Sequence, residues 1–508
     1  MKSSVVQIII LGACILVGLV AVIVFSKYGK NDNGAENATV AVWGTFPQSV
    51  FNTISAKLNL EKPGSLLINY VEKKEETFET ELTEALLSGE GPDVVIIPES
   101  ILHKHERRFT LIGFDSLPER SFKDTFAEAG EVFITKDGAY ALPFLIDPLV
   151  LYWNRDTLNS KAISLPPTKW EDITSLAERL TEKTEGRLIR KSAIPFGEYQ
   201  NVSHAKEVLA VLAFQAGSYF TERDSTGKLR NVSAKNLLPT APVESFNEKN
   251  PLALALSFYT SFADPTKPQY SWNRSFTDSV SVFARGDIAL LPAFASDLKL
   301  IRDKNPNLNF DLATIPQAKS LGDNRVTYGK VYGLAILGSS PHKLAAWNTI
   351  QTLTSPEVEK LIAEETGLAP SRRDLLAGIP GKSEEGAVWQ SAIFAHSWVD
   401  PDPIRTAVLF KDMIESVTTG RLTPENAAEV FSNELNQEKK DQFLNSYKKV
   451  ATLDTLEPVY KARDIMTHDV IYARNDLTIE DIYYLIKDKK VSQIPITGFG
   501  KKIIGIVN

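Results

Sequence analysis

Three short β-rich runs near the start of the chain are separated by two segments with helical periodicity. The β-rich runs are residues 38–43, 65–71 and 94–97, and amphipathic patterns at 50–58 and 76–87 lie between them. Strands that alternate with helices in this way indicate an α/β fold with a largely parallel sheet. The sequence therefore predicts an α/β domain at the start of the soluble body.

Parallel sheets of this kind bind ligands in the crevice at the carboxyl ends of their strands. Gly44 and Thr45 follow the first strand, directly after Trp43, and Glu99 follows the third strand. A flat indole ring can stack on the C–H face of a sugar, and a carboxylate can accept hydrogen bonds from hydroxyl groups. These four residues are predicted ligand contacts. The alternatives are a core position for Trp43 and a solvated loop position for Glu99.

Two long extended segments later in the chain are predicted to cross between two lobes. Residues 139–154 form a β-branched and aromatic run that is too long for one ordinary strand and contains Pro143 and Pro148. Residues 327–337 form a second, glycine-punctuated β segment, which a helical run at 341–353 follows. Crossings of this kind would form the hinge of a two-lobed molecule.

The crossing segments supply further candidate ligand contacts. Asp147 lies within an apolar run, where an acid must be paired or must face a cleft. Tyr152 and Trp153 alternate along a strand, so only one of them can face the cleft, and Tyr152 is the candidate. Tyr328 and Tyr332 are candidates in the second crossing. For each of these residues a purely structural role is the alternative.

The chain opens with an apolar run at residues 5–25 that is interrupted only by Gln7. As a helix this run is about 31 Å long, which is enough to cross the hydrocarbon core of a bilayer. We expect residues 1–30 to form a cytoplasmic tip and an uncleaved transmembrane signal anchor, with a linker at 31–37. The alternatives are a lipoprotein signal acylated at Cys14 and a cleaved signal peptide.

Composition and motifs argue against several classes of function. The formal net charge of −7, without a basic run, argues against nucleic acid as a partner. Cys14 is the single cysteine, so the body has no disulfide, no thiolate nucleophile and no cysteine-ligated metal. His103 and His105 lack the further ligands of a metal motif, and no Walker loop, Gly-x-Gly-x-x-Gly or Gly-x-Ser-x-Gly pattern occurs. We therefore predict no enzyme activity, no metal and no cofactor.

A series of short motifs follows the chain from residue 38 to about residue 440. They are VAVWG at 40–44, GPDV at 91–94, ALP at 141–143, VLYWN at 150–154, PTKWED at 167–172, GDIAL at 286–290, YGLAI at 332–336, AAW at 345–347, LTSPE at 353–357, TGLAP at 366–370 and GRLTPE at 420–425. In their order and spacing the chain resembles extracellular solute-binding proteins of family 1, the maltose-binding-protein-like receptors of ABC importers.

The resemblance implies a two-lobed periplasmic-binding-protein-like fold of type II. The expected domains are 38–146 and 331–375 for lobe 1, and 147–330 and 376–445 for lobe 2, with a linker at 446–460. It also implies that the body lies outside the cytoplasm, so with the anchor at the start of the chain we expect a single-pass protein of the cell membrane. Such a receptor would close around a small polar solute, with a carbohydrate favoured, and deliver it to importer permease subunits. The alternative is a ligand sensor or interaction module with the same fold.

Two further candidates depend on this resemblance. Trp272 lies in a loop before the Gly286 segment, where the family often places an aromatic residue, and Phe294 follows the next strand. Core packing is the alternative for both.

The last residues, 461–508, resemble a single CBS motif. The matching segments are ARDIMTHDVI at 462–471, NDLTIED at 475–481, VSQIPIT at 491–497 and KIIGIVN at 502–508. Such motifs pack in pairs to form an adenosine-nucleotide cleft, and this segment stops before the usual closing helix. We therefore expect a small partial CBS-like α/β segment that binds no nucleotide.

Overall fold

The structure is a computed structural model, and its described residues form two compact units. It describes residues 39–61, 67–185, 188–223, 229–231, 250–322, 324–381 and 383–435, with three short strands between 473 and 507. The units are Met1–Glu438 and Lys439–Asn508. The predicted membrane anchor at 5–25 and the residue Cys14 lie outside the described residues. Among the helices that are described, none combines the length and the apolar character that a membrane crossing needs.

The alternation of strands and helices predicted for the first hundred residues is confirmed. The elements are β1 (Thr39–Gly44), α2 (Gln48–Glu61), β2 (Leu67–Glu72), α3 (Glu75–Ser88) and β3 (Val94–Pro98). β1 lies between β2 and β3 and is parallel to both, with Trp43 opposite Val71 on one side and Val95 on the other. The carboxyl ends of the three strands therefore meet at one edge of the sheet.

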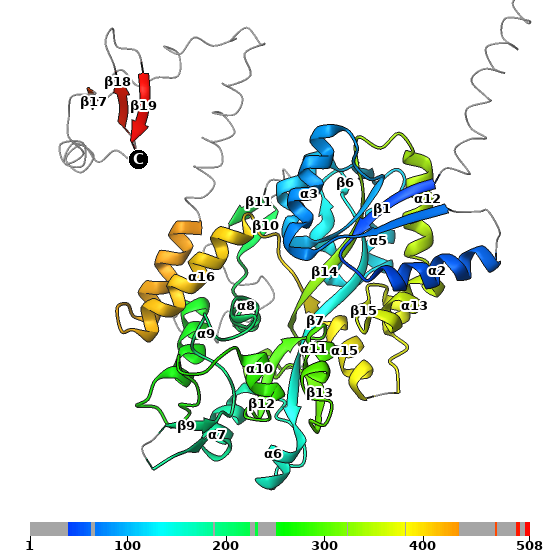
Figure 1. Cartoon of the computed structure of the whole chain (residues 1–508). Coiled ribbons are helices and arrows are strands. Elements are labelled where there is room, and N and C mark those ends of the chain that lie inside the picture. The colour runs from blue at the N-terminus through cyan, green and yellow to red at the C-terminus, as the bar shows by residue number, and fades with distance from the viewer. Residues whose placement is uncertain are drawn as a thin grey trace, which may run out of the picture. The chain divides into compact units, whose positions relative to one another are not determined.

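Two long strands, β7 (Leu142–Asn154) and β14 (Thr327–Ile336), run antiparallel through the middle of a nine-stranded sheet (Figure 1). The sheet order is β12-β7-β14-β3-β1-β2. The end of β14 pairs with β3, whereas the second half of β7 pairs with β12 (Leu290–Phe294) and β13 (Phe310–Thr314). These two strands connect the β1–β3 region with the β12–β13 region, as the predicted crossings require.

The first crossing is one continuous strand of 13 residues, which differs from the expectation that it is too long for a single strand. Proline donates no backbone hydrogen bond and is tolerated in a sheet only at edges and irregularities. Pro143 lies opposite Gly333, where the register between β7 and β14 shifts. Pro148 lies at the end of the β14 pairing, just before β7 changes partner to β12 at Leu149. Each proline therefore coincides with a break in the hydrogen-bond ladder.

The remaining elements divide between the two ends of the sheet. We call the region around β1–β3 the first lobe and the region around β12 and β13 the second lobe. In the first lobe are η1 (Glu99–Ile101), α4 (Leu102–His105), η2 (Glu106–Arg108), β4 (Ile112–Gly113), α5 (Glu119–Thr125), η3 (Glu128–Phe133), β5 (Ile134–Thr135), β6 (Gly138–Ala139), α12 (Lys343–Leu353), α13 (Pro356–Thr366), β15 (Ala369–Pro370) and α14 (Arg373–Leu376). In the second lobe are α6 (Arg155–Ser160), α7 (Trp170–Leu180), β8 (Glu182–Lys183), β9 (Ile189–Lys191), α8 (Ala205–Gln215), β10 (Thr221–Arg223), β11 (Leu229–Asn231), α9 (Pro251–Thr260), η5 (Ser261–Ala263), α10 (Ser279–Ala284), α11 (Asp297–Lys304), η6 (Lys319–Leu321) and α16 (Pro403–Thr418).

Two further elements lie where the lobes join. The helix α15 (Ser383–Ile393) packs on β13, β7 and β15, and the short strand β16 (Ala395–His396) pairs with the start of β14. The predicted lobe boundaries at 146/147 and 330/331 fall inside β7 and β14, where Asp147 and Lys330 are paired across the two strands.

The hydrophobic core consists of two clusters of buried side chains, and β7 contributes to both. Val150 and Tyr152 belong to the larger cluster, which includes the β1–β3 region. Leu149, Leu151 and Trp153 belong to the second cluster, which lies under α7, α8 and α9. Successive side chains of a strand point to opposite faces, so this one strand joins the two cores.

The C-terminal unit contains a three-stranded sheet. Its strands are β17 (Ala473–Arg474), β18 (Ile494–Thr497) and β19 (Ile503–Val507), in that order, with β17 parallel and β19 antiparallel to β18. Strands β18 and β19 lie within the two β segments predicted for the CBS-like motif. The predicted helix start at 475–481 and the linker at 446–460 lie outside the described residues.

Candidate functional site

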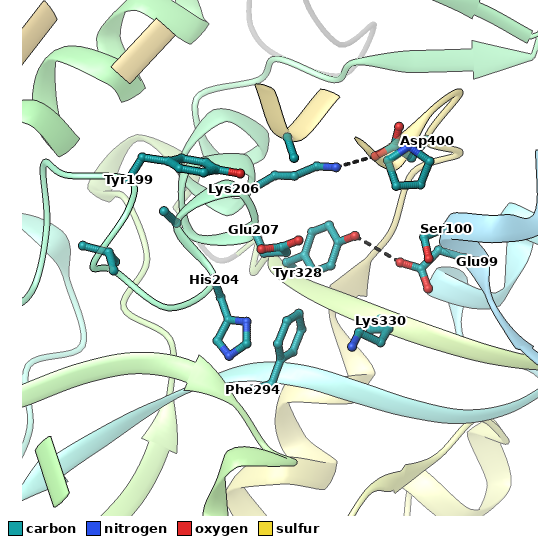
Figure 2. Close-up of a pocket in the computed structure, with 14 residues that line it drawn as sticks. Glu99, Ser100, Tyr199, His204, Lys206, Glu207, Phe294, Tyr328, Lys330 and Asp400 are labelled. Atoms are coloured by element: carbon teal, nitrogen blue, oxygen red, sulfur yellow. Dashed lines mark hydrogen bonds and ion pairs between the residues drawn. The ribbon is translucent and has the colours of Figure 1, made fainter. Parts of the chain in front are cut away.

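A cavity of about 380 Å³ lies where β14 meets both lobes (Figure 2). Glu99 and Ser100 reach it from the first lobe, directly after β3. Tyr328 and Lys330 line it from β14, and Phe294 lines it from the end of β12. The second lobe adds the start of α8 and the start of α16. Elements that lie far apart in the sequence therefore converge on one polar cavity.

Glu99 is a buried carboxyl group in the wall of this cavity, with only 2 % of its surface exposed. One carboxyl oxygen accepts a hydrogen bond from the Tyr328 hydroxyl at 3.0 Å, and the other accepts one from the Val331 N–H at 2.9 Å. Burial disfavours the charged form and outweighs these hydrogen bonds, so the pKa of Glu99 is raised to about 7. A carboxyl group in this state exchanges its proton near neutral pH.

Lys330 projects from β14 into the same region. Its ammonium nitrogen lies 5.1 Å from the centroid of the Phe294 ring and 3.8 Å from the Glu75 carboxylate. Burial alone would lower the pKa of Lys330, but the phenol of Tyr332 and the carboxylate of Asp147 outweigh it and hold the pKa above its ordinary value. Lys330 is therefore a fixed positive charge at the hinge strand.

The second lobe contributes His204, the residue that precedes α8. His204 has φ 59° and ψ 30°, the left-handed region that residues other than glycine rarely adopt. Its Nε2 lies 2.8 Å from the Asp297 carboxylate, and its ring meets the Phe294 ring edge-on at 4.8 Å. Burial alone would lower the pKa of His204, but its hydrogen bond with Asp297 and the charge of that residue raise the pKa above its ordinary value. A strained backbone of this kind persists where the surroundings fix it, and such positions cluster at functional sites.

The first turn of α8 places two charged side chains at the cavity. Lys206 donates hydrogen bonds to the Asp400 carboxylate and, at 2.7 Å, to the Thr406 hydroxyl, and so connects α8 to α16. Burial raises the pKa of Asp400 despite this ion pair. Glu207 follows Lys206, and its carboxylate has no hydrogen-bond or ion-pair partner among the described residues.

The family of the chain follows from its match to a family model. The model for bacterial extracellular solute-binding proteins matches residues 67–392, which is well over half of the chain. This chain belongs to the bacterial extracellular solute-binding proteins. The family assignment made from the sequence motifs is confirmed, and a CBS domain model matches residues 462–508.

Individual relatives of this solute-binding protein are distant in sequence. A protein of Brucella abortus (strain 2308) that is named as a binding protein is 20 % identical over 346 residues, which is 68 % of this chain and 77 % of that protein. The sugar-binding protein MalE from Xanthomonas citri is 16 % identical, with a TM-score of 0.63, and the match covers 80 % of this chain and 99 % of that one. An ABC transporter solute-binding protein from Thermotoga lettingae, bound with α-D-tagatose, is 19 % identical, with a TM-score of 0.57, and the match covers 78 % and 99 %. At these identities the likeness to solved structures shows the fold.

Three of the predicted ligand contacts line the cavity of this solute-binding protein, namely Glu99, Phe294 and Tyr328. Their contact with a solute stays a prediction. One other lies nearby: Asp147 is fully buried beside Lys330 and accepts a hydrogen bond from the Ser296 N–H at 3.0 Å.

The predicted contacts at the end of β1 lie in the first lobe, away from the cavity lining. Trp43 is half-buried, and the Lys73 ammonium lies 3.8 Å from the centroid of its ring. Gly44 is buried, and Thr45 is half-buried beside it. Tyr332, which is half-buried on β14, packs against Phe46 with ring centroids 4.8 Å apart. A role for these residues in binding also stays a prediction.

Tyr152 and Trp272 are core residues, which corrects the expectation that they face the cleft. Both are 0 % exposed. The Tyr152 hydroxyl donates to the Phe294 carbonyl oxygen at 2.8 Å, and the Trp272 Nε1–H donates to the Asn201 side-chain oxygen at 3.0 Å. An aromatic residue with a polar tip is stable in a core when the tip finds a partner, and both residues do.

Four residues of the second lobe that line the cavity were not predicted from the sequence, namely Tyr199, His204, Lys206 and Glu207. After its first turn α8 is buried on all sides, so its periodicity indicates only a core helix. One feature of the sequence could have located them: Lys206 and Glu207 stand at the start of an otherwise apolar helix. Charged groups next to a buried helix need polar surroundings, such as a cavity. In the described part of the chain no group of three or more His, Cys, Asp or Glu side chains is placed to hold a metal ion.

Proposed function

We propose that this solute-binding protein captures a small polar solute, with a carbohydrate favoured, in the cavity between its lobes. The captured solute would then pass to the permease subunits of an ABC importer. The arrangement of β7 and β14 carries this proposal. Both strands cross between the lobes, and the cavity is lined from the first lobe, from the second lobe and from β14 itself. Closure about such a hinge would bury a solute between the lobes.

The chemistry of the cavity suits a hydroxyl-rich solute. A ring hydroxyl both donates and accepts hydrogen bonds, and Glu207 offers an acceptor while Lys330 and Ser100 offer donors. Tyr199 adds a half-buried aromatic ring to the lining. Solved structures with this fold include a cyclo/maltodextrin-binding protein complexed with maltotetraose, which supports a sugar as the solute.

We also propose that the apolar run at 5–25 anchors the body to the outer face of the cell membrane. The length of that run and the extracellular family support this topology. Addition of protease to intact cells or spheroplasts is the test. Digestion of the body without lysis supports the topology, and protection of the body until lysis contradicts it.

Calorimetric titration of the full chain in detergent with neutral mono- and oligosaccharides tests solute binding. A sugar at 100 times its dissociation constant adds about 2.7 kcal/mol to the free energy of unfolding, so a thermal-shift screen finds it first. Uptake of the labelled sugar by cells with and without the gene then distinguishes an import receptor from a sensor. Loss of uptake without the gene supports import, whereas unchanged uptake favours the sensor.

Replacement of Tyr199 by alanine is expected to weaken the binding of that sugar about tenfold. An aromatic face contributes roughly 0.5–1.5 kcal/mol beyond its buried area, and about 1.4 kcal/mol corresponds to a factor of ten. Tyr199→Phe keeps the ring and serves as the matched control in the same titration. Equal affinity of the alanine variant and the unchanged protein would show that the sugar does not contact this ring.

A further inference from the structure

The positive charges around the cavity already have partners, whereas one negative charge has none. His204 is paired with Asp297, and Lys206 with Asp400. Glu207 also lines the cavity, but no described residue donates a hydrogen bond to its carboxylate or forms an ion pair with it. The cavity therefore holds an uncompensated acid that a ligand can reach.

Lys330 does not compensate this acid. Its ammonium group lies 3.8 Å from the Glu75 carboxylate, and β14 pairs it directly with Asp147 on β7. Glu99, which follows β3, also helps to hold the pKa of Lys330 above its ordinary value. Lys330 therefore has acidic neighbours of its own and is not a partner of Glu207.

Glu207 lies among aromatic rings. Figure 2 shows it between Tyr199, His204 and Tyr328. Burial raises the pKa of Tyr199 to about 12, and the nearby charge of Glu207 adds to this shift. The same charge also acts on His204 and Tyr328. A carboxylate and a tyrosine ring that line the same cavity form a combination that attracts an ammonium group, through an ion pair and a cation–π contact.

We propose that the solute carries a protonated amine, which pairs with Glu207 beside the ring of Tyr199, so that the preferred ligand is an amino sugar. This inference rests on the proposed function, because it assumes that the cavity is the solute site. Glu207 would act as a specificity-determining residue that selects the amine-bearing form of a sugar over the neutral form. The hydroxyl groups of the same ligand would form hydrogen bonds with Lys330, Ser100 and Glu99.

The test compares ligands that differ only in the substituent at carbon 2 of each sugar ring, using the full chain in detergent. One set is glucosamine, N-acetylglucosamine and glucose, and a second set is the chitosan disaccharide, its diacetylated form and cellobiose. Spermidine provides amines without a sugar ring. We expect the amine-bearing sugars to bind about 10- to 100-fold more tightly than their acetylated partners, the range typical of a hydrogen bond to a charged group.

The variant Glu207→Gln keeps the shape of the side chain and removes its charge. It is expected to abolish the preference for the amine, so that the amine-bearing sugars bind no more tightly than their neutral partners. Glu178→Gln is the matched control, because Glu178 is an exposed glutamate on α7 of the same lobe. That control changes the net charge of the protein equally, so it should retain the full preference.

The outcomes separate this inference from the proposed function. Equal or tighter binding of the neutral sugars overturns the amine preference and leaves a carbohydrate receptor. Binding of spermidine alone supports the pairing of an amine with Glu207 only if Glu207→Gln abolishes it, and it overturns the choice of a sugar. An amine preference that survives in Glu207→Gln overturns the role of this residue, and the absence of any binding overturns both proposals.

Discussion

Replacement of Trp272 by alanine is expected to lower the free energy of unfolding by about 3–5 kcal/mol, the range for loss of a large aromatic side chain from a core. Trp272 is 0 % exposed and stacks on Phe276 with ring centroids 4.2 Å apart. Truncation would also remove the hydrogen bond that the indole N–H donates to the Asn201 side-chain oxygen, and that oxygen would lose its partner. Urea unfolding followed by far-ultraviolet circular dichroism measures the loss.

The same variant decides between a core role and a ligand role for this residue. Trp43→Ala is the matched control, since Trp43 is half-buried at the end of β1 and its removal should cost much less stability. We expect Trp272→Ala, once folded, to bind solute with unchanged affinity. Near-native stability combined with lost affinity would instead make Trp272 a ligand contact.

Replacement of Glu99 by glutamine is expected to remove a pH-dependent penalty on stability. The pKa of Glu99 is about 7 in the folded chain, well above the usual glutamate value of about 4.3 in an unfolded chain. Between these two values the folded state holds a proton that the unfolded state has lost, so the contribution of Glu99 to stability falls as the pH rises. Above pH 7 the full penalty is about 3–4 kcal/mol, at 1.36 kcal/mol for each pKa unit.

Unfolding of both proteins by urea from pH 4.5 to pH 8 checks this expectation. The advantage of Glu99→Gln should grow with pH across this range and level off above about pH 7. Glutamine can still accept from the Val331 N–H and can donate to the Tyr328 hydroxyl oxygen, so its packing is preserved. A difference that stays constant over the whole range would show that Glu99 is already ionised at pH 5. Glu178→Gln controls for a general change of charge.

The parts of the fold that were predictable are those that local patterns specify. Alternating β-rich and amphipathic segments located β1 to β3, and the composition of residues 139–154 indicated a crossing. The register that places Asp147 opposite Lys330 was not predictable, because it depends on strands about 180 residues apart. The register shift beside Pro143 and the change of partner after Pro148 explain why a proline-containing run forms a single strand.

Within the candidate site, only residues at or beside the end of a strand were predictable from the sequence. Glu99 was found because it follows β3 at the carboxyl edge of the sheet. Trp272 was chosen for its aromatic ring, but burial of that ring depends on Asn201 and Phe276, and local sequence does not show such contacts. The residues at the start of α8 were missed because their partners, Asp297 and Asp400, are 93 and 194 positions away.

The strand β7 imposes a delay on folding. Its 13 residues are all buried, and its partners in β12, β13 and β14 come more than 130 residues later in the chain. Contacts at such sequence separations are slow to form. At a synthesis rate of about 5–20 residues per second, the edge of β7 that pairs with β14 stays open for roughly ten seconds or longer before β14 has been made. An apolar strand with an unpaired edge is a site for aggregation, so this hazard ends only when β14 has been made and has paired.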